Sequence, residues 1–266
     1  MRNIRGRRTY LWAVFLLVSG LGFGLFYSNF FSGWMETPLR PAPPVIDQAL
    51  QKPSFQMTPI ETLRFQDDAS LARWERKVFK GETQYAIRGD AGDRYLNALS
   101  ENASCGLFMK TRHEAVPGLY LRWKWRVREF PKKKIPTRLS SREEDDFAAR
   151  LYVIFEASNL FRSDIIEYIW DENIAAGEAA DSAYSDRIKL LVVRSGKSPE
   201  GGAWQEETRN PLDDYKKLFG RMPKYPMGIV ALMCDSDNTG TRASADFGDI
   251  VFGMGKDQLS AGEGEI

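Results

Sequence analysis

Two patterns of hydrophobic and polar positions divide this chain, and the first is a long apolar run near the start. The run covers 22 residues, from Tyr10 to Phe31, and contains no charged side chain. A helix of that length spans roughly 33 Å at about 1.5 Å per residue, enough to cross a bilayer core of about 30 Å. We therefore expect residues 10–31 to form a transmembrane helix with the lipid bilayer as its partner.

The residues around this run predict its orientation. Four arginines lie within residues 1–9, and the positive-inside rule keeps such a basic tip in the cytoplasm. The alternative is a cleaved signal peptide, but its apolar part is normally 7–15 residues long and ends at a small-residue cleavage site. Residues 30–34 (FFSGW) make a poor cleavage site. The pattern favours a single-pass anchor in the cytoplasmic membrane, and cleavage of the segment stays open.

The second pattern is a series of short strand-like segments in the rest of the chain, and the clearest of them, residues 119–128, shows strict alternation. There Leu119, Leu121, Trp123 and other apolar residues alternate with arginine and lysine, as in a strand with one buried and one polar face. Further strands are expected at residues 60–65, 84–89, 95–100, 105–111, 148–155, 165–170, 188–195, 228–234 and 243–252. Many short strands of this kind predict a mainly all-β fold, a β-sandwich.

One short helix interrupts the strands. Asn210 is a good N-cap, Pro211 suits the first helical position, and Gly220 is a natural stop. Leu212, Tyr215 and Phe219 share one helix face, so the helix should cover an opening of the sandwich. We place a proline-rich tether at residues 32–57, the sandwich domain at 58–255 and a flexible tail at 256–266.

Composition excludes several functional classes. The formal net charge is +1 and four leading arginines contribute to it, so the domain has no strong basic field and nucleic acid is not an expected partner. The single histidine, His113, precludes multi-histidine metal sites and reads as a turn residue. Cys105 and Cys234 either pair in an oxidising compartment or pack as small buried thiols, and the sequence leaves both open.

Several separate segments, in order, resemble a bacterial family catalogued as domain of unknown function 3047. They are DDFAARLY at 145–152, YIW at 168–170, the stretch from Trp204 to Gly220, MCDSDNT at 233–239 and FGDI at 247–250. The resemblance covers roughly residues 60–252 and implies a bacterial domain without an assigned activity. Its overall pattern is similar to jelly-roll domains of the galactose-binding kind. The basic tip and apolar run, taken with the positive-inside rule, place this domain in the periplasm with an anchor in the inner membrane.

A basic stripe is the first candidate ligand site. Arg122, Lys124 and Arg126 lie on the polar face of the strand at 119–128, and Arg150 is expected to join them from a neighbouring strand. Asp145 and Asp146 could supply counter-charge. Arginine forks on a sheet face suit an anionic glycan or a phosphate. The alternative is a solvated face with weak cross-strand ion pairs.

Aromatic side chains near strand ends are the second candidate. Tyr168, Trp170 and Trp204 are placed to contact a ligand, together with Glu206, although large aromatic residues usually belong to the core. Trp123 and Trp125 lie on the apolar face of their strand, so we expect both in the core.

The most site-like loop is DSDNTG at residues 235–240. Asp235 and Asp237, with Asp246 at position 12 of the count, partly match a calcium loop. The flanks read as strands, however, and a hairpin turn capped by its own aspartate and asparagine side chains is the alternative. Calcium is therefore the one cofactor that the sequence suggests.

No catalytic motif accompanies these candidates: the phosphate-binding loop, G-x-G-x-x-G and G-x-S-x-G are all absent. We expect a non-catalytic binding module for an envelope glycan or polysaccharide. A carboxylate-based carbohydrate-active enzyme and a protein-interaction domain of an envelope assembly remain alternatives, so whether the protein is an enzyme stays open.

Overall fold

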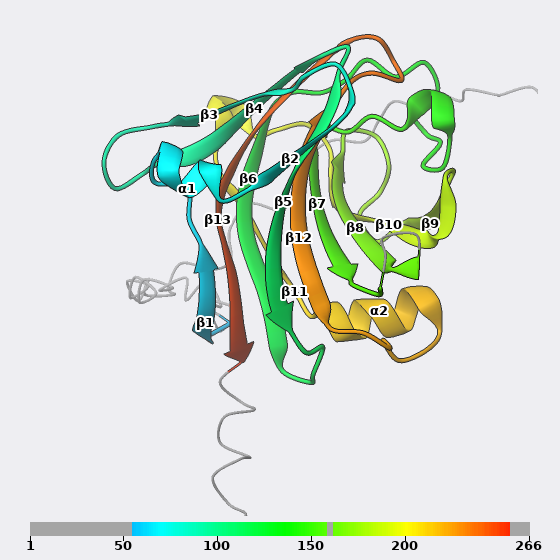
Figure 1. The fold of residues 1–266 in the computed structure, drawn as a ribbon. Coiled ribbons are helices and arrows are strands. Elements are labelled where there is room, and N and C mark those ends of the chain that lie inside the picture. Colours follow the sequence, from blue (N-terminus) through cyan, green and yellow to red (C-terminus); the bar gives the residue numbers. More distant parts are fainter. Residues whose placement is uncertain (1–54, 159–161, 256–266) are drawn as a thin grey trace, which may run out of the picture. The chain divides into compact units, whose positions relative to one another are not determined.

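The computed structural model describes residues 55–158 and 162–255. The predicted basic tip 1–9, membrane span 10–31 and tail 256–266 lie outside the described residues, as does the tether 32–57 except for its last three. Among the residues that are described, no helix combines the length and apolar character needed to cross a membrane. The described part is a mainly β domain of two packed sheets, which confirms the predicted β-sandwich (Figure 1).

The first sheet has six strands in the order β11-β6-β13-β4-β3, with β1 also paired to β13. Its strands are β1 (Met57–Leu63), β3 (Gln84–Arg88), β4 (Tyr95–Glu101), β6 (Leu119–Glu129), β11 (Gln205–Arg209) and β13 (Arg242–Gly255). The long β13 pairs with β6 along one side, and with β4 and then β1 along the other. All of these pairings are antiparallel.

The second sheet has seven strands in the order β2-β5-β12-β7-β8-β10-β9. Its strands are β2 (Glu75–Lys80), β5 (Ser104–His113), β7 (Ala149–Phe155), β8 (Asp164–Asp171), β9 (Ala179–Ser182), β10 (Ser185–Ser195) and β12 (Met227–Asp235). The pairing of β8 with β10 is parallel, and every other pairing in this sheet is antiparallel.

The core lies between the sheets and is built by the alternation of the strands. Trp123 and Trp125 of β6 are 1% and 0% exposed, which confirms their predicted place in the core. They meet aromatic side chains of β8 from the facing sheet, since the Trp123 and Tyr168 rings lie 5.3 Å apart. Because side chains alternate across a strand, burying these rings turns the charged residues of β6 to the outside.

The predicted helix is present as α2 (Pro211–Phe219), with Asn210 as its N-cap. The Asn210 side chain accepts hydrogen bonds from the N–H groups of Leu212 and Asp213, and Gly220 closes the helix at φ 67°. Tyr215 is fully buried, and its ring lies 4.6 Å from that of Phe155. The helix therefore closes the end of the sandwich where β7 ends and β8 begins (Figure 1).

Three short strands and a second helix were not predicted from the sequence. The strands β2, β9 and β11 lie at sheet edges, and α1 (Asp68–Ala72) is one turn with a capping box at Asp67. Edge strands bury one side at most, so their sequences carry little apolar alternation. The β11 sequence QEETR, for example, holds no apolar residue.

His113 and the two cysteines lie inside strands. His113 ends β5 rather than a turn, and its Nε2 lies 2.6 Å from an oxygen of Glu61. Cys105 of β5 lies directly opposite Cys234 of β12, and both are free, fully buried thiols. Burial raises the pKa of each thiol, which keeps both in the unreactive protonated form.

Candidate functional site

The residues singled out in the sequence separate onto two sheets. Arg122, Lys124 and Arg126 lie on the outer surface of the six-stranded sheet, and Arg150 lies on the outer surface of the seven-stranded sheet. The expectation that Arg150 joins the basic stripe is therefore wrong. The cause is strand order, because β7 follows β6 in the chain but enters the other sheet.

We define the cationic stripe as the group on the six-stranded sheet that combines charges with two aromatic rings. Its members are Tyr95, Arg122, Lys124, Arg126, Trp204 and Glu206. The Arg126 guanidinium lies 4.3 Å from the centre of the Trp204 ring and 4.8 Å from that of Tyr95. The Nζ of Lys124 lies 4.9 Å from the same Trp204 ring. Stacking on cations holds both half-buried rings at the surface.

The outer ion pairs of the stripe are long and open to solvent. Arg122 lies 3.6 Å from Glu206, and Lys124 lies 3.7 Å from Asp93. The two carboxylates are 62% and 71% exposed. Exposed pairs of this kind contribute about 0.2–1 kcal/mol, so an incoming anion could displace them at little cost.

Asp246 is the buried acceptor that holds Arg126 of the stripe in place. It does not join the loop that was predicted to bind calcium. It lies within β13, with a side chain only 1% exposed, and accepts hydrogen bonds of 2.8 Å from the Nε atoms of both Arg126 and Arg128. Its other oxygen accepts a 2.7 Å bond from Asn97. The predicted position 12 of the calcium loop therefore lies on a different sheet from Asp235, because β12 and β13 enter opposite sheets.

The second group is enclosed, and we call Asp145, Arg150, Glu167 and Asp235 the acid–arginine cluster. Arg150 is 3% exposed and forms a two-pronged pair with Asp235, with donor–acceptor distances of 2.9 and 2.7 Å. It also donates a 2.6 Å bond to Glu167 and a bond to the backbone carbonyl of Asp145. The cluster thus uses the donors of one guanidinium to hold three strands and a loop together.

The carboxyl groups of this cluster have perturbed acidity. Burial raises the pKa of Glu167 to about 7, although Arg150 opposes the shift. Burial likewise raises the pKa of Asp145 and of Asp235. In all three groups burial is the main cause of the raised pKa, and the Arg150 guanidinium opposes it.

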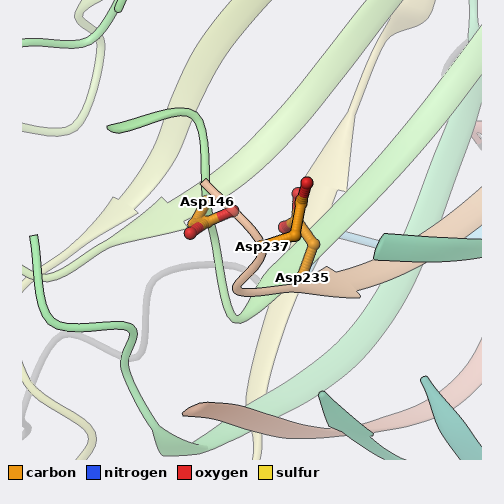
Figure 2. A group of neighbouring side chains, drawn as sticks. All are labelled: Asp146, Asp235 and Asp237. Atoms are coloured by element: carbon orange, nitrogen blue, oxygen red, sulfur yellow. The ribbon is translucent and has the colours of Figure 1, made fainter. Parts of the chain in front are cut away.

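Asp146, Asp235 and Asp237 are the described residues that come closest to a metal site (Figure 2). One oxygen from each lies within 4.8 Å of the others. Both oxygens of Asp146 already accept backbone N–H groups, at 3.1 Å from Asn238 and 2.6 Å from Thr239. Asp235 accepts hydrogen bonds from Arg150. Two of the three carboxylates therefore already have donors within the protein, and the bonds to Asp146 hold the turn at residues 238–239 in place.

Tyr168 and Trp170 are not available to a ligand, which corrects the sequence-based expectation. Both belong to β8 and point into the core, with exposed fractions of 0% and 1%. The Tyr168 hydroxyl donates a 2.8 Å bond to Asp214 of α2, and the Trp170 indole donates to the carbonyl of Gly196. Their YIW pattern alternates between the two faces of a strand that is buried on both sides.

Tyr95, Glu167 and Lys133 were not predicted as site residues from the sequence. Tyr95 begins β4, and Trp204 directly precedes β11. The two rings meet through the pairings of β4 with β13, of β13 with β6 and of β6 with β11. Lys133 is 5% exposed and pairs with Asp171 at 2.9 Å, and its burial lowers its pKa. A single local signal was present for Glu167, a charged residue within the apolar sequence DIIEYIWD.

Comparison with known sequences and structures gives one family and several distant likenesses. The family described as "Protein of unknown function (DUF3047)" matches residues 72–251. No curated protein sequence matches the chain.

Three solved structures illustrate the distant likenesses. The glycoside hydrolase domain of Endo-D from Streptococcus pneumoniae R6 is 10% identical with a TM-score of 0.33, over 68% of this chain and 22% of its own. The family 11 carbohydrate-binding module of Lic26A-Cel5E from Clostridium thermocellum is 7% identical with a TM-score of 0.37, over 75% and 96%. The xyloglucanase domain of NopAA from Sinorhizobium fredii is 11% identical with a TM-score of 0.38, over 68% and 92%. This chain spans about a fifth of the length of the first, and likenesses at these scores carry no functional argument.

Proposed function

The chain belongs to the DUF3047 family, and we propose that its domain is a non-catalytic module that binds an acidic polysaccharide through the cationic stripe. The observation that carries this proposal is the packing of Arg126 against Trp204 and Tyr95 on an outer sheet face. Aromatic rings offer apolar surface to a sugar ring, while guanidinium groups pair with its carboxylates. The stripe combines both kinds of group on one sheet.

The arrangement also fits an extended ligand. Arg122, Lys124 and Arg126 alternate along β6 and face the same side, about 7 Å apart at roughly 3.4 Å per residue. A chain of acidic sugars presents its charges in repeating fashion, so successive residues of β6 can pair with successive sugars. The displaceable partners Glu206 and Asp93 occupy these cations when no ligand is present.

The proposal includes a finer fold type and a location. The sandwich would be of the jelly-roll or galactose-binding type, in keeping with its mostly antiparallel sheets. The arginine-flanked apolar run at 10–31 supports a single-pass anchor in the inner membrane, with the domain in the periplasm. A reporter enzyme that is active only in the periplasm, fused after residue 266, would be inactive if this location were wrong.

The test is calorimetric titration of the full-length chain with polygalacturonate and with the neutral polymer dextran. Polygalacturonate should bind, and its affinity should fall between 50 and 300 mM salt because exposed charges are screened. Trp204→Ala should weaken binding at least tenfold, about 1.4 kcal/mol. Tyr184→Ala is the matched control. Its exposed ring also lies under an arginine, with the Arg142 guanidinium 5.2 Å from the ring centre, but it does not belong to the stripe. Equal affinity of Trp204→Ala and the unmodified chain would exclude the stripe as the binding site.

A second candidate function is hydrolysis of the glycan, and the raised pKa of Glu167 favours it, since a general acid needs a pKa near neutrality. Binding without hydrolysis is better supported, because the Glu167 side chain is 4% exposed and bound to Arg150. Asp146 and Glu206 are two further acidic candidates. Asp146 precedes β7 of the seven-stranded sheet, whereas Glu206 lies in β11 of the six-stranded sheet. Release of reducing ends from polygalacturonate by the unmodified chain, lost in Glu167→Gln, would establish the enzyme instead.

A further inference from the structure

A second cationic surface lies away from the stripe, at the start of β8 beside α2. It is a pocket of about 520 Å³ lined by Arg162, Asp164, Arg187, Arg221, Lys224 and Tyr225. Four of these side chains are cations and one is an acid, so the lining carries a net positive charge. The volume lies within the range of about 300–1,000 Å³ that is typical of small-molecule sites.

A buried carboxylate fixes two of the cations. Asp164 is 4% exposed and accepts bonds from Arg187 Nη1 at 2.9 Å and from Arg221 Nη2 at 2.7 Å. The Tyr215 hydroxyl donates to the same carboxylate at 2.5 Å. The single negative charge of Asp164 therefore orients two guanidinium groups. The three groups together carry a net charge of +1, which favours an anionic ligand.

Both guanidinium groups remain open on the pocket side. The Arg187 and Arg221 side chains are each 47% exposed. Arg221 is also stacked against the rings of Tyr215 and Phe219, each 5.4 Å away. Because these contacts already hold the two arginine side chains in place, less side-chain entropy is lost when a ligand binds. This distinguishes the pair from freely rotating surface arginines.

An adjoining hollow of about 280 Å³ has a balanced charge. It shares Asp164, Arg187 and Arg221 with the first pocket, and its other charged residues are Asp181, Asp186 and Lys189, of which Lys189 pairs with Asp181. Carboxylate oxygens accept hydrogen bonds from hydroxyl groups. The two connected hollows thus offer cations for an anionic group and acceptors for a neighbouring hydroxyl-bearing group.

We propose that this pocket binds the phosphate group of a small phosphorylated polyol, with the polyol hydroxyls directed to the carboxylates of the adjoining hollow. Paired guanidinium forks match the oxygen atoms of phosphate, and a single phosphate would leave most of the pocket volume empty. The site is independent of the cationic stripe and shares no residue with it. A free sugar phosphate and the headgroup of a phospholipid present the same chemistry, and the experiment separates them.

The test is calorimetric titration of the full-length chain with α-D-glucose 1-phosphate and with glycerophosphoglycerol, the soluble diester of a lipid headgroup. Glucose serves as the uncharged comparison. At least one phosphorylated compound should bind in the micromolar to millimolar range and glucose should not. Tighter binding of the monoester assigns a free sugar phosphate as the source, and tighter binding of the diester assigns a headgroup.

Two variants keep the outcome decisive. Arg187→Gln and Lys224→Gln should each weaken binding at least fivefold. The exposed Lys224 forms no ion pair with another described residue, so its substitution should leave the domain folded. Arg242→Gln is the matched control, a 52% exposed arginine paired with Glu101 at 3.2 Å on the other sheet. Absence of binding by both phosphorylated compounds, or unchanged affinity in both variants, overturns the proposal. Trp204→Ala should leave this binding unchanged, so failure here and failure of the polysaccharide proposal are distinguishable.

Discussion

The two sheets each place an arginine on their outer surface among acidic neighbours, with opposite consequences. Arg126 of the cationic stripe is 15% exposed and contacts two aromatic rings and one buried aspartate. Arg150 of the acid–arginine cluster is 3% exposed, and its donors are taken up by Asp235, Glu167 and the Asp145 backbone. The same residue type keeps partial contact with solvent in one place and is fully enclosed by its partners in the other.

Enclosure accounts for this difference. Loop residues cover the seven-stranded sheet around Arg150, and the Phe147 ring lies 4.6 Å from its guanidinium. In a poorly solvated setting charges interact strongly, and an unpaired one is costly. On the six-stranded sheet water screens the outer charges, so Arg122 and Lys124 can exchange partners at little cost. Whether a charged residue can bind a ligand or only stabilises the fold therefore depends on how far the surrounding residues exclude water from it.

The largest expected effect is the removal of Arg150. Arg150→Met should lower the free energy of unfolding by about 3–5 kcal/mol, because Asp235 and Glu167 remain buried without their partner. Arg122→Met on the stripe should cost less than about 1 kcal/mol. Urea unfolding of the full-length chain measures both. Equal losses for the two variants would show that the cluster and the stripe do not differ in the way described.

The next effect is a pH dependence confined to the cluster. The folded-state pKa of Glu167, about 7, exceeds its usual value of about 4.3, so the folded protein binds more protons between these values. Stability contributed through Glu167 is therefore present at low pH and falls as the pH rises, by about 2 kcal/mol between pH 5.5 and pH 8.

Urea unfolding at pH 5.5 and pH 8 checks this dependence. Among the described residues, Arg150, Asp145 and Tyr152 interact with the Glu167 carboxyl group. Glu167→Gln keeps these three groups and should flatten the fall in stability with pH. Glu206→Gln is the matched control on the stripe and should leave the slope unchanged. A slope that persists in Glu167→Gln would mean that another group titrates.

A smaller effect should follow loss of the anchor of the stripe. Arg126→Ala removes one of the two arginine donors to Asp246, and Arg128 retains the other at 2.8 Å. The expected loss is about 1–2 kcal/mol, since the buried carboxylate keeps a charged partner. Asp246→Ala should cost more than Arg126→Ala, because it leaves two cations without their shared acceptor; the opposite ranking would contradict this account.

The smallest expected effect concerns metal. The melting temperature should differ by less than about 1 °C between EDTA and 2 mM calcium, since donors already satisfy Asp146 and Asp235. Asp237→Asn should leave both values unchanged. A rise of several degrees with calcium, absent in Asp237→Asn, would show that the three aspartates bind the ion after all.

Most of the fold could be predicted from local patterns. The alternation in 119–128 predicted β6 and the burial of both its tryptophans, and the Asn210–Pro211 pair predicted the start of α2. The edge strands could not be found, because β11 gains its order from pairing with β6 and not from its own residues. The aromatic and basic candidates could be located along the chain but not assigned to a common surface.

By itself the sequence determined the β-sandwich, the two faces of β6 and the ends of α2, because these follow from spacing along one strand or helix. Only the tertiary structure decided that Arg150 leaves the stripe, that Tyr168 and Trp170 are enclosed and that Tyr95 meets Trp204. The reason is physical: periodicity says that a side chain has a buried or an exposed face, whereas its partners depend on which sheet its strand joins. That choice arises from pairings between residues far apart in the chain.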